Sequence, residues 1–166
     1  MKQIVKYYRN LESLGSFFYL RNQFIAMQVT MAEVNKQHVE KRVRDWKKRV
    51  ASLYSEIKLW MKDSEYSFKL GSKLTMYEEL MSQFGVPATE IDTADIHKGK
   101  QFILTIKPKG LWIIGANGRI DILTTKGNYM LVDSSEQFSS PQWKLFNGDK
   151  LNGVEFNKQT FLKLLK

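Results

Sequence analysis

The feature of this sequence that most constrains its fold is a long stretch without a helix breaker. No glycine or proline occurs between Gly15 and Gly71, and apolar residues recur every three and four positions along this stretch. Counted in sevens from Ile4 to Trp60, all nine positions of one heptad class are apolar. Such spacing is typical of coiled coils and helix bundles. The sequence therefore predicts long N-terminal helices, most clearly over residues 39–60.

The pattern leaves the partner of these helices open. No pair of residues flanking the seam of a parallel homodimer joins opposite charges, and Lys36 would lie within that seam, so this dimer is disfavoured. An antiparallel hairpin within the chain remains, as does assembly with a second copy or a helical protein partner. The side chains that we predict for helix association are Val39, Val43, Trp46, Val50, Leu53, Ile57 and Trp60.

The second half of the sequence contains most of the glycines and prolines. Eight of the ten glycines and all three prolines occur from Gly85 onward, and apolar residues alternate with polar ones between them. Glycine and proline mark turns, and alternation marks half-buried strands. Asn117-Gly118 predicts a tight hairpin turn, and Asn157 predicts the N-cap of a terminal helix. The expected strands are 102–107, 111–114, 119–123, 129–132 and 142–146.

Together these patterns predict an α+β fold. Long N-terminal helices with a heptad pattern, forming a helical hairpin or coiled coil, precede a small antiparallel β-meander or barrel-like domain with a C-terminal helix. We expect a helical region over 1–63 and the β domain over 101–166. Residues 64–100 carry four basic and six acidic residues and a short helical pattern near Thr75–Phe84. They are expected to form a connector with a short helix.

A dense basic stretch within the helical region is the main indication of a partner. The chain carries a net charge of +9, and residues 36–63 alone contain nine basic and four acidic residues. A basic stripe on a rigid helix can follow the phosphates of a nucleic acid. The alternative is an ordinary solvated face, because Glu40–Arg44 and Asp45–Arg49 have the spacing of helix ion pairs. The candidate binding residues are Lys41, Arg42, Arg44, Lys47, Lys48, Arg49 and Lys62.

Three carboxylates offer the most plausible catalytic chemistry. Asp121 and Asp133 flank the predicted turn at Lys126-Gly127, and Glu136 follows closely. Clustered carboxylates can hold a divalent metal ion. The pattern resembles restriction-type nucleases, in which an aspartate precedes a hairpin bearing Asp/Glu-x-Lys, except that Ser135 stands in the lysine position. The resemblance implies a metal-dependent nuclease acting through Asp121 and Asp133.

Other chemistries find little support in the sequence. There is no cysteine, the two histidines are far apart, and no glycine-rich loop carries the lysine of a phosphate-binding motif. We therefore predict no cofactor and no metal site, and no catalytic residue beyond the three candidates. No run of 18 apolar residues predicts a membrane span, and the lack of cysteine fits a cytoplasmic location.

The expected function is that of a non-enzymatic interaction or regulatory protein. Its N-terminal helices would mediate self-association or bind a helical partner, and its basic helix face would contact an acidic partner, with nucleic acid the first choice. The alternatives are the metal-dependent nuclease and a structural subunit of a larger protein assembly.

Overall fold

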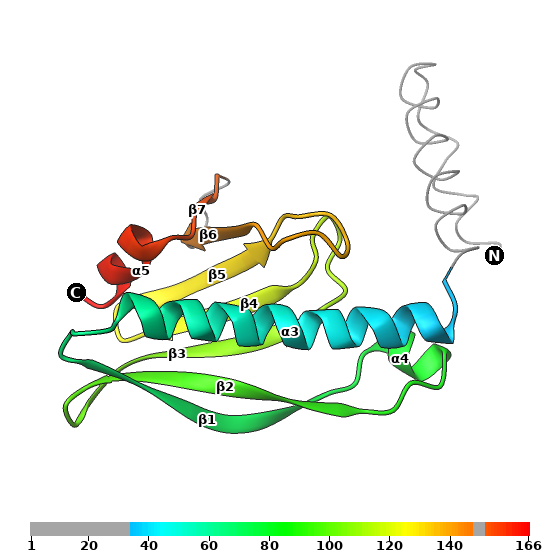
Figure 1. Ribbon diagram of the computed structural model, residues 1–166, viewed down its shortest axis with the longest axis horizontal. Helices are drawn as coiled ribbons and strands as arrows, with labels where there is room; N and C mark the ends of the chain where they lie inside the picture. Colours follow the sequence, from blue (N-terminus) through cyan, green and yellow to red (C-terminus); the bar gives the residue numbers. More distant parts are fainter. Residues whose placement is uncertain (1–33, 148–151) are drawn as a thin grey trace, which may run out of the picture. The chain divides into compact units, whose positions relative to one another are not determined.

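One long helix lies along an antiparallel sheet, as Figure 1 shows. The fold comes from a computed structural model, which describes residues 34–147 and 152–166. The chain divides at Asn35 into two units, and the fold described is that of Lys36–Lys166. Helix α3 (Lys36–Trp60) begins this unit and a seven-stranded sheet follows it.

The sheet is a simple meander in which each strand pairs antiparallel with the next along the chain. Helix α4 (Glu79–Gln83) connects the first two strands, and α5 (Lys158–Leu164) follows the last one. The strands are β1 (Tyr66–Met76), β2 (Thr89–Lys98), β3 (Gln101–Gly110), β4 (Arg119–Thr124), β5 (Gly127–Asp133), β6 (Trp143–Asn147) and β7 (Val154–Glu155).

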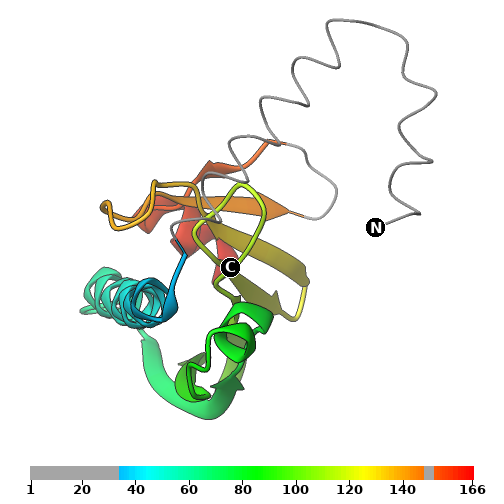
Figure 2. The same cartoon turned by 90° about the vertical axis from the view of Figure 1, so that its right-hand side faces the viewer.

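The core lies between α3 and the concave face of the sheet. Viewed along α3, the strands from β1 to β6 curve around the helix (Figure 2). The apolar side of α3 turns into this curve, and its largest fully buried side chain, Trp46, is only 1% exposed. Removing so much apolar surface from water is the main force that holds helix and sheet together. The sheet meets α3 with the buried side chains Ala94, Ile96, Leu104, Ile106, Ile120, Ile122 and Leu131.

Gly118, in the loop before β4, lies directly against Trp46 of α3. Its φ is +128°, and a Cβ atom built there would lie 2.3 Å from Cζ3 of Trp46. Gly115, in the same loop, also has a positive φ of +74°, but a Cβ atom there would meet no atom of the described residues within 4 Å. Both glycines therefore adopt a positive φ, but only Gly118 has a side chain, that of Trp46, packed against its Cα atom.

We expect Gly118→Ala to destabilise the fold by about 3 kcal/mol, because it adds a steric overlap with Trp46 to the backbone strain. Gly115→Ala is the matched control and should cost about 1 kcal/mol, from the backbone alone. Urea denaturation followed by tryptophan fluorescence measures both variants. Equal costs at the two positions would contradict the packing of Trp46 on this loop.

Tyr54 fastens the C-terminal half of α3 to the second strand. Its hydroxyl donates a hydrogen bond to the main-chain oxygen of Asp92 at 2.8 Å, and its ring packs edge-on against Phe68. Burial raises the pKa of the Tyr54 phenol well above 10, and the nearby Asp92 and Asp95 raise it further. The folded protein therefore holds this proton more tightly than the unfolded chain does.

This raised pKa predicts a loss of stability at alkaline pH. The contribution of Tyr54 is complete below the unfolded pKa of about 10 and is lost as the pH rises above it. We expect Tyr54→Phe to be less stable than the wild type by about 1 kcal/mol near neutral pH, through the lost hydrogen bond. This deficit should shrink by about 1.4 kcal/mol for each pH unit above 10 and then change sign. A deficit in the free energy of unfolding that stays constant over this pH range would contradict the prediction.

The predicted fold class is wrong in its N-terminal part. The described residues show one helix followed by a seven-stranded sheet, with neither a long helical hairpin nor a coiled coil. The heptad face of α3 is buried by the chain's own sheet, because a helix lying on a sheet needs the same three-four apolar spacing as a coiled coil. The earlier heptad positions, from Ile4 to Ala32, lie outside the described residues.

Residues 64–100, which we expected to form a connector, contain β1, α4 and β2. The long edge strand β1 is mostly exposed, so it carries little of the apolar alternation that identifies a strand. In β2, charged residues such as Glu90, Asp92 and Asp95 are interspersed with the buried side chains. Neither strand therefore shows the regular apolar alternation from which a strand is predicted.

The expected strand at residues 111–114 is also wrong. These residues belong to the loop between β3 and β4, in which the only isolated bridge joins Ile113 to Ala116. The carboxylate of Glu78 accepts hydrogen bonds from the main-chain N–H groups of Leu111 and Trp112, at 2.8 and 3.2 Å. Side-chain capping thus replaces the strand partner that an apolar run would normally require.

Two simpler expectations are confirmed. The sheet is antiparallel, and Asn157 caps α5, accepting a hydrogen bond from the main-chain N–H of Thr160 at 3.1 Å. Within the described part of the chain, no helix is long and apolar enough to cross a membrane.

Candidate anion-binding face

The basic stretch of α3 divides between two sides of the helix. Because a helix turns every 3.6 residues, neighbouring cations cannot all point the same way. Arg42 and Arg49, seven residues apart, turn toward the sheet and are 2% and 3% exposed. The other five predicted binding residues are exposed to solvent: Lys41, Arg44, Lys47, Lys48 and, just beyond the helix, Lys62. We call these five residues the basic face.

Arg49 is the centre of a buried ion-pair network. Its Nη1 atom donates to Oδ2 of Asp133 at 2.6 Å, and its Nε atom donates to Oδ2 of Asp45 at 2.6 Å. It also donates to the Ser135 hydroxyl at 2.9 Å and to the main-chain oxygen of Ser139 at 2.7 Å. Burial opposes the charged form, but the hydrogen bonds to Asp45 and Asp133 outweigh it and raise the pKa of Arg49. Arg49 thereby ties α3 to the loop after β5.

Arg42 is buried on the same side of α3, two turns before Arg49, and has no comparable partners among the described residues. Its Nε and Nη1 atoms are buried and have no hydrogen-bond partner in the part of the chain that the structure describes. Its guanidinium carbon lies 5.8 Å from the ring centre of Phe138. Burial lowers the pKa of Arg42, and the negative charge of Asp45 offsets this only in part. The two arginines thus look alike in the sequence, but only Arg49 has the ion pairs that would stabilise the fold.

This contrast predicts opposite effects of two identical substitutions. Arg49→Met should destabilise the fold by about 3–5 kcal/mol, because it leaves the fully buried carboxylate of Asp133 without its cation. Arg42→Met should lie within about 1 kcal/mol of the wild type or be more stable, because an apolar side chain replaces a charge with unmet hydrogen bonds. Chemical denaturation compares them, and equal destabilisation by both would contradict the described network.

Few acidic groups neutralise the basic face. Glu40 is the only carboxylate paired with it among the described residues, and its contact with Arg44 is long, at 3.9 Å. Lys47 donates to the Thr89 hydroxyl at 3.1 Å, which orients it without reducing its charge. Asp45 already pairs with Arg49, and Glu90, whose charge also acts on Lys47, pairs with Lys73. The exposed side of α3 therefore presents a clear excess of positive charge.

The loop between β5 and β6 reaches the N-terminal end of α3, where it contacts His38 and Lys41. Phe138, at its tip, has a positive φ of 64° and is 38% exposed. The Lys41 ammonium lies 4.1 Å from the centre of its ring, a cation–π distance, and His38 meets the ring edge-on. Sequence reasoning missed Phe138, whose only signal was a single aromatic residue within a polar loop.

The three carboxylates proposed for catalysis do not come together. Asp121 lies on β4 between the inward-facing Ile120 and Ile122, so it points away from α3, and it pairs with Arg119 at 2.7 Å. Asp133 points the opposite way, toward Arg49, and Glu136 is exposed in the following loop. No group of three or more possible metal ligands occurs among the described residues. The geometry gives the nuclease alternative no support.

The side chains predicted for helix association are occupied within the same unit. Six of the seven are buried, and Trp60 packs on Phe156 and Phe161 with ring centres 5.5 and 5.8 Å away. The apolar side of α3 is therefore unavailable to a second helix unless the sheet is displaced. A proposal of self-association cannot rest on these residues.

Comparisons with protein-family models, curated proteins and solved structures found no match.

Proposed function

We propose that the protein is a binding protein whose basic face contacts an acidic partner, with nucleic acid the first candidate. The observation that carries this proposal is the exposed excess of charge on one side of α3. Lys41, Arg44, Lys47 and Lys48 all point to solvent within eight residues, against the single carboxylate of Glu40. Lys41, Arg44 and Lys48 have the i, i+3, i+7 spacing that aligns them along the helix.

The support for this face is rigid. The opposite side of α3 is buried against the sheet along its length, and Arg49 and Tyr54 add polar anchors to the sheet and its loop. A rigid helix holds its cations in place before binding, so less conformational entropy is lost on contact with a partner. The distance from Lys41 to Lys62 is about 30 Å at the rise of an α-helix, which matches roughly nine base-pair steps of a nucleic-acid duplex.

Nucleic acid is favoured over an acidic protein because the exposed side chains of α3 from Lys41 to Lys48 are all cationic. Beyond Lys48 the exposed side of the helix is mixed, with small residues, Glu56, Lys58 and the 68% exposed Leu59. An acidic protein surface normally offers apolar contacts beside its charges. A phosphate backbone requires only cations and hydrogen-bond donors at the helix surface.

The test is a charge-reversal variant compared with a matched control. The triple change Lys41→Glu, Arg44→Glu and Lys48→Glu should abolish binding of a fluorescent mixed-sequence 20-nucleotide duplex, measured by anisotropy. The control reverses Lys100, Lys158 and Lys163, which are exposed and lie off α3, and produces the same net charge. It should retain binding with a modest loss from long-range attraction.

Salt dependence gives a second readout. If three or four phosphates are neutralised, the binding constant should fall about 50-fold between 50 and 200 mM salt, following a log–log slope of about −3. Equal losses in the two triple variants would show that binding reflects net charge alone. Absence of binding by the wild type at low salt would overturn the assignment to nucleic acid.

A further inference from the structure

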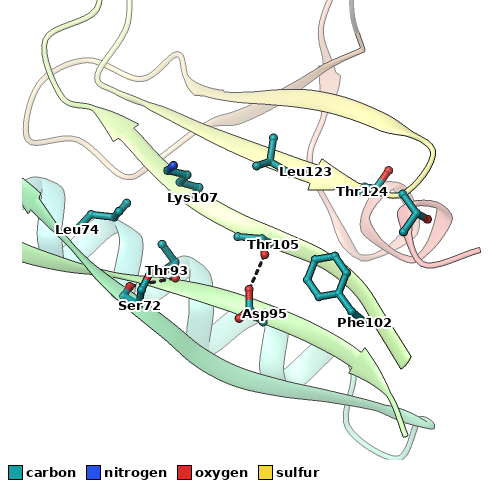
Figure 3. Close-up of a pocket in the computed structure, with 10 residues that line it drawn as sticks. Ser72, Leu74, Thr93, Asp95, Phe102, Thr105, Lys107, Leu123 and Thr124 are labelled. Carbon is teal, nitrogen blue, oxygen red and sulfur yellow. Dashed lines mark hydrogen bonds between the residues drawn. The ribbon is translucent and has the colours of Figure 1, made fainter. Parts of the chain in front are cut away.

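A hollow on the face of the sheet opposite α3 has the features of a ligand site. It measures about 560 Å³ and is formed by side chains of β1, β2, β3 and β4 and of the turn that follows β4 (Figure 3). This volume is within the range of small-molecule pockets. The lining combines five hydroxyl groups with apolar side chains and two charges of opposite sign. The basic face lies on α3, across the sheet from this hollow.

Asp95 is the central polar group of the hollow. Its Oδ1 atom accepts a hydrogen bond from the Thr105 hydroxyl at 2.5 Å, and it has no ion-pair partner among the described residues. The neighbouring Thr93 hydroxyl is turned away, donating to the main-chain oxygen of Ser72 at 3.0 Å. The second oxygen of Asp95 therefore keeps its capacity to accept hydrogen bonds from a ligand.

Gly71 keeps this carboxylate open. A Cβ atom at residue 71 would lie 3.1 Å from Oδ2 of Asp95 and 2.3 Å from the Thr93 hydroxyl oxygen. Any larger residue would thus occupy the space beside the unpaired oxygen. The pairing of β1 with β2 also shifts register between Leu70 and Lys73.

An aromatic ring and a lysine complete the lining along β3. Phe102 is 42% exposed, and its ring meets His97 edge-on with centres 5.8 Å apart, which fixes its orientation. Lys107 lies farther along the same strand, on the other side of Thr105 (Figure 3). It is exposed and forms no ion pair with another described residue. The charges of Asp95 and Lys107 balance.

We propose that this hollow binds a neutral saccharide. Sugar hydroxyls donate to a carboxylate and exchange hydrogen bonds with threonine hydroxyls, and the apolar face of a sugar ring packs on an exposed aromatic ring. A polyphosphate is disfavoured because Asp95 would repel it and Lys107 is the only cation in the lining. A wholly apolar ligand would bury Asp95 without a hydrogen-bond donor, at a high cost.

The experiment is a titration of the ¹⁵N-labelled protein with maltotetraose, cellotetraose and chitotetraose, each to about 10 mM, a concentration that detects millimolar dissociation constants. Inorganic phosphate serves as the anionic probe. We expect at least one saccharide to cause saturable shifts of the amides of Gly71, Thr93, Asp95 and Thr105, and phosphate to leave them unmoved. No shift with any of the three saccharides, or a stronger response to phosphate, would overturn the proposal.

Two variants assign the binding to the named side chains. Phe102→Ala and Asp95→Asn should each weaken saccharide binding at least tenfold, while their spectra retain the dispersion of the folded protein. The matched control is Leu70→Ala, which removes an exposed apolar side chain of β1 outside the hollow. It should bind like the wild type. Unchanged affinity in both Phe102→Ala and Asp95→Asn would place the saccharide elsewhere and contradict the assignment.

The saccharide proposal is independent of the proposed nucleic-acid contact. Asp95→Asn should leave duplex binding intact, because the basic face lies on α3. The charge-reversal variant of α3 should likewise retain the saccharide-induced shifts. Loss of both activities in either variant would indicate a general failure of the fold, which the spectra detect directly.

Discussion

The burial of one side of α3 in the curved sheet is the constraint on which the rest of the structure depends. Trp46 fills the space beneath Gly118, and its neighbours along the helix meet the inward side chains of the central strands. Once this side is buried, the helix cannot rotate, so its other residues have fixed roles. The solvent side is left with the cations, and the outer face of the sheet is left uncovered by α3.

Much of the local structure could be predicted from the sequence, but the way its parts pack could not. The four strands from β3 to β6 follow apolar alternation, and the cap at Asn157 follows from its residue type. An apolar stripe on a helix states only that one side is buried, and it carries no information on whether a helix or a sheet covers it. The strand β1 was missed because an exposed edge strand need not alternate.

The candidate site shows the same limit at the level of single residues. Lys41, Arg42, Lys48 and Arg49 look equivalent in a count of charges, yet the helical period places two in solvent and two against the sheet. The period alone could have separated them, because Arg42 and Arg49 are adjacent to the apolar seam. What could not be predicted is the partner of Arg49, since Asp133 is 84 residues away in the sequence.

The buried arginines also explain why the basic face can be strongly charged without weakening the fold. The charges of Arg42 and Arg49 balance those of Asp45 and Asp133, so the charges on this side of α3 do not add to the repulsion among the exposed cations. The exposed lysines are in water, where like charges repel weakly at physiological ionic strength. The face can thus retain a positive potential for a partner, while the stability of α3 depends on the opposite side. Substitutions on the buried side of α3 should therefore change stability, and substitutions on the basic face should change binding.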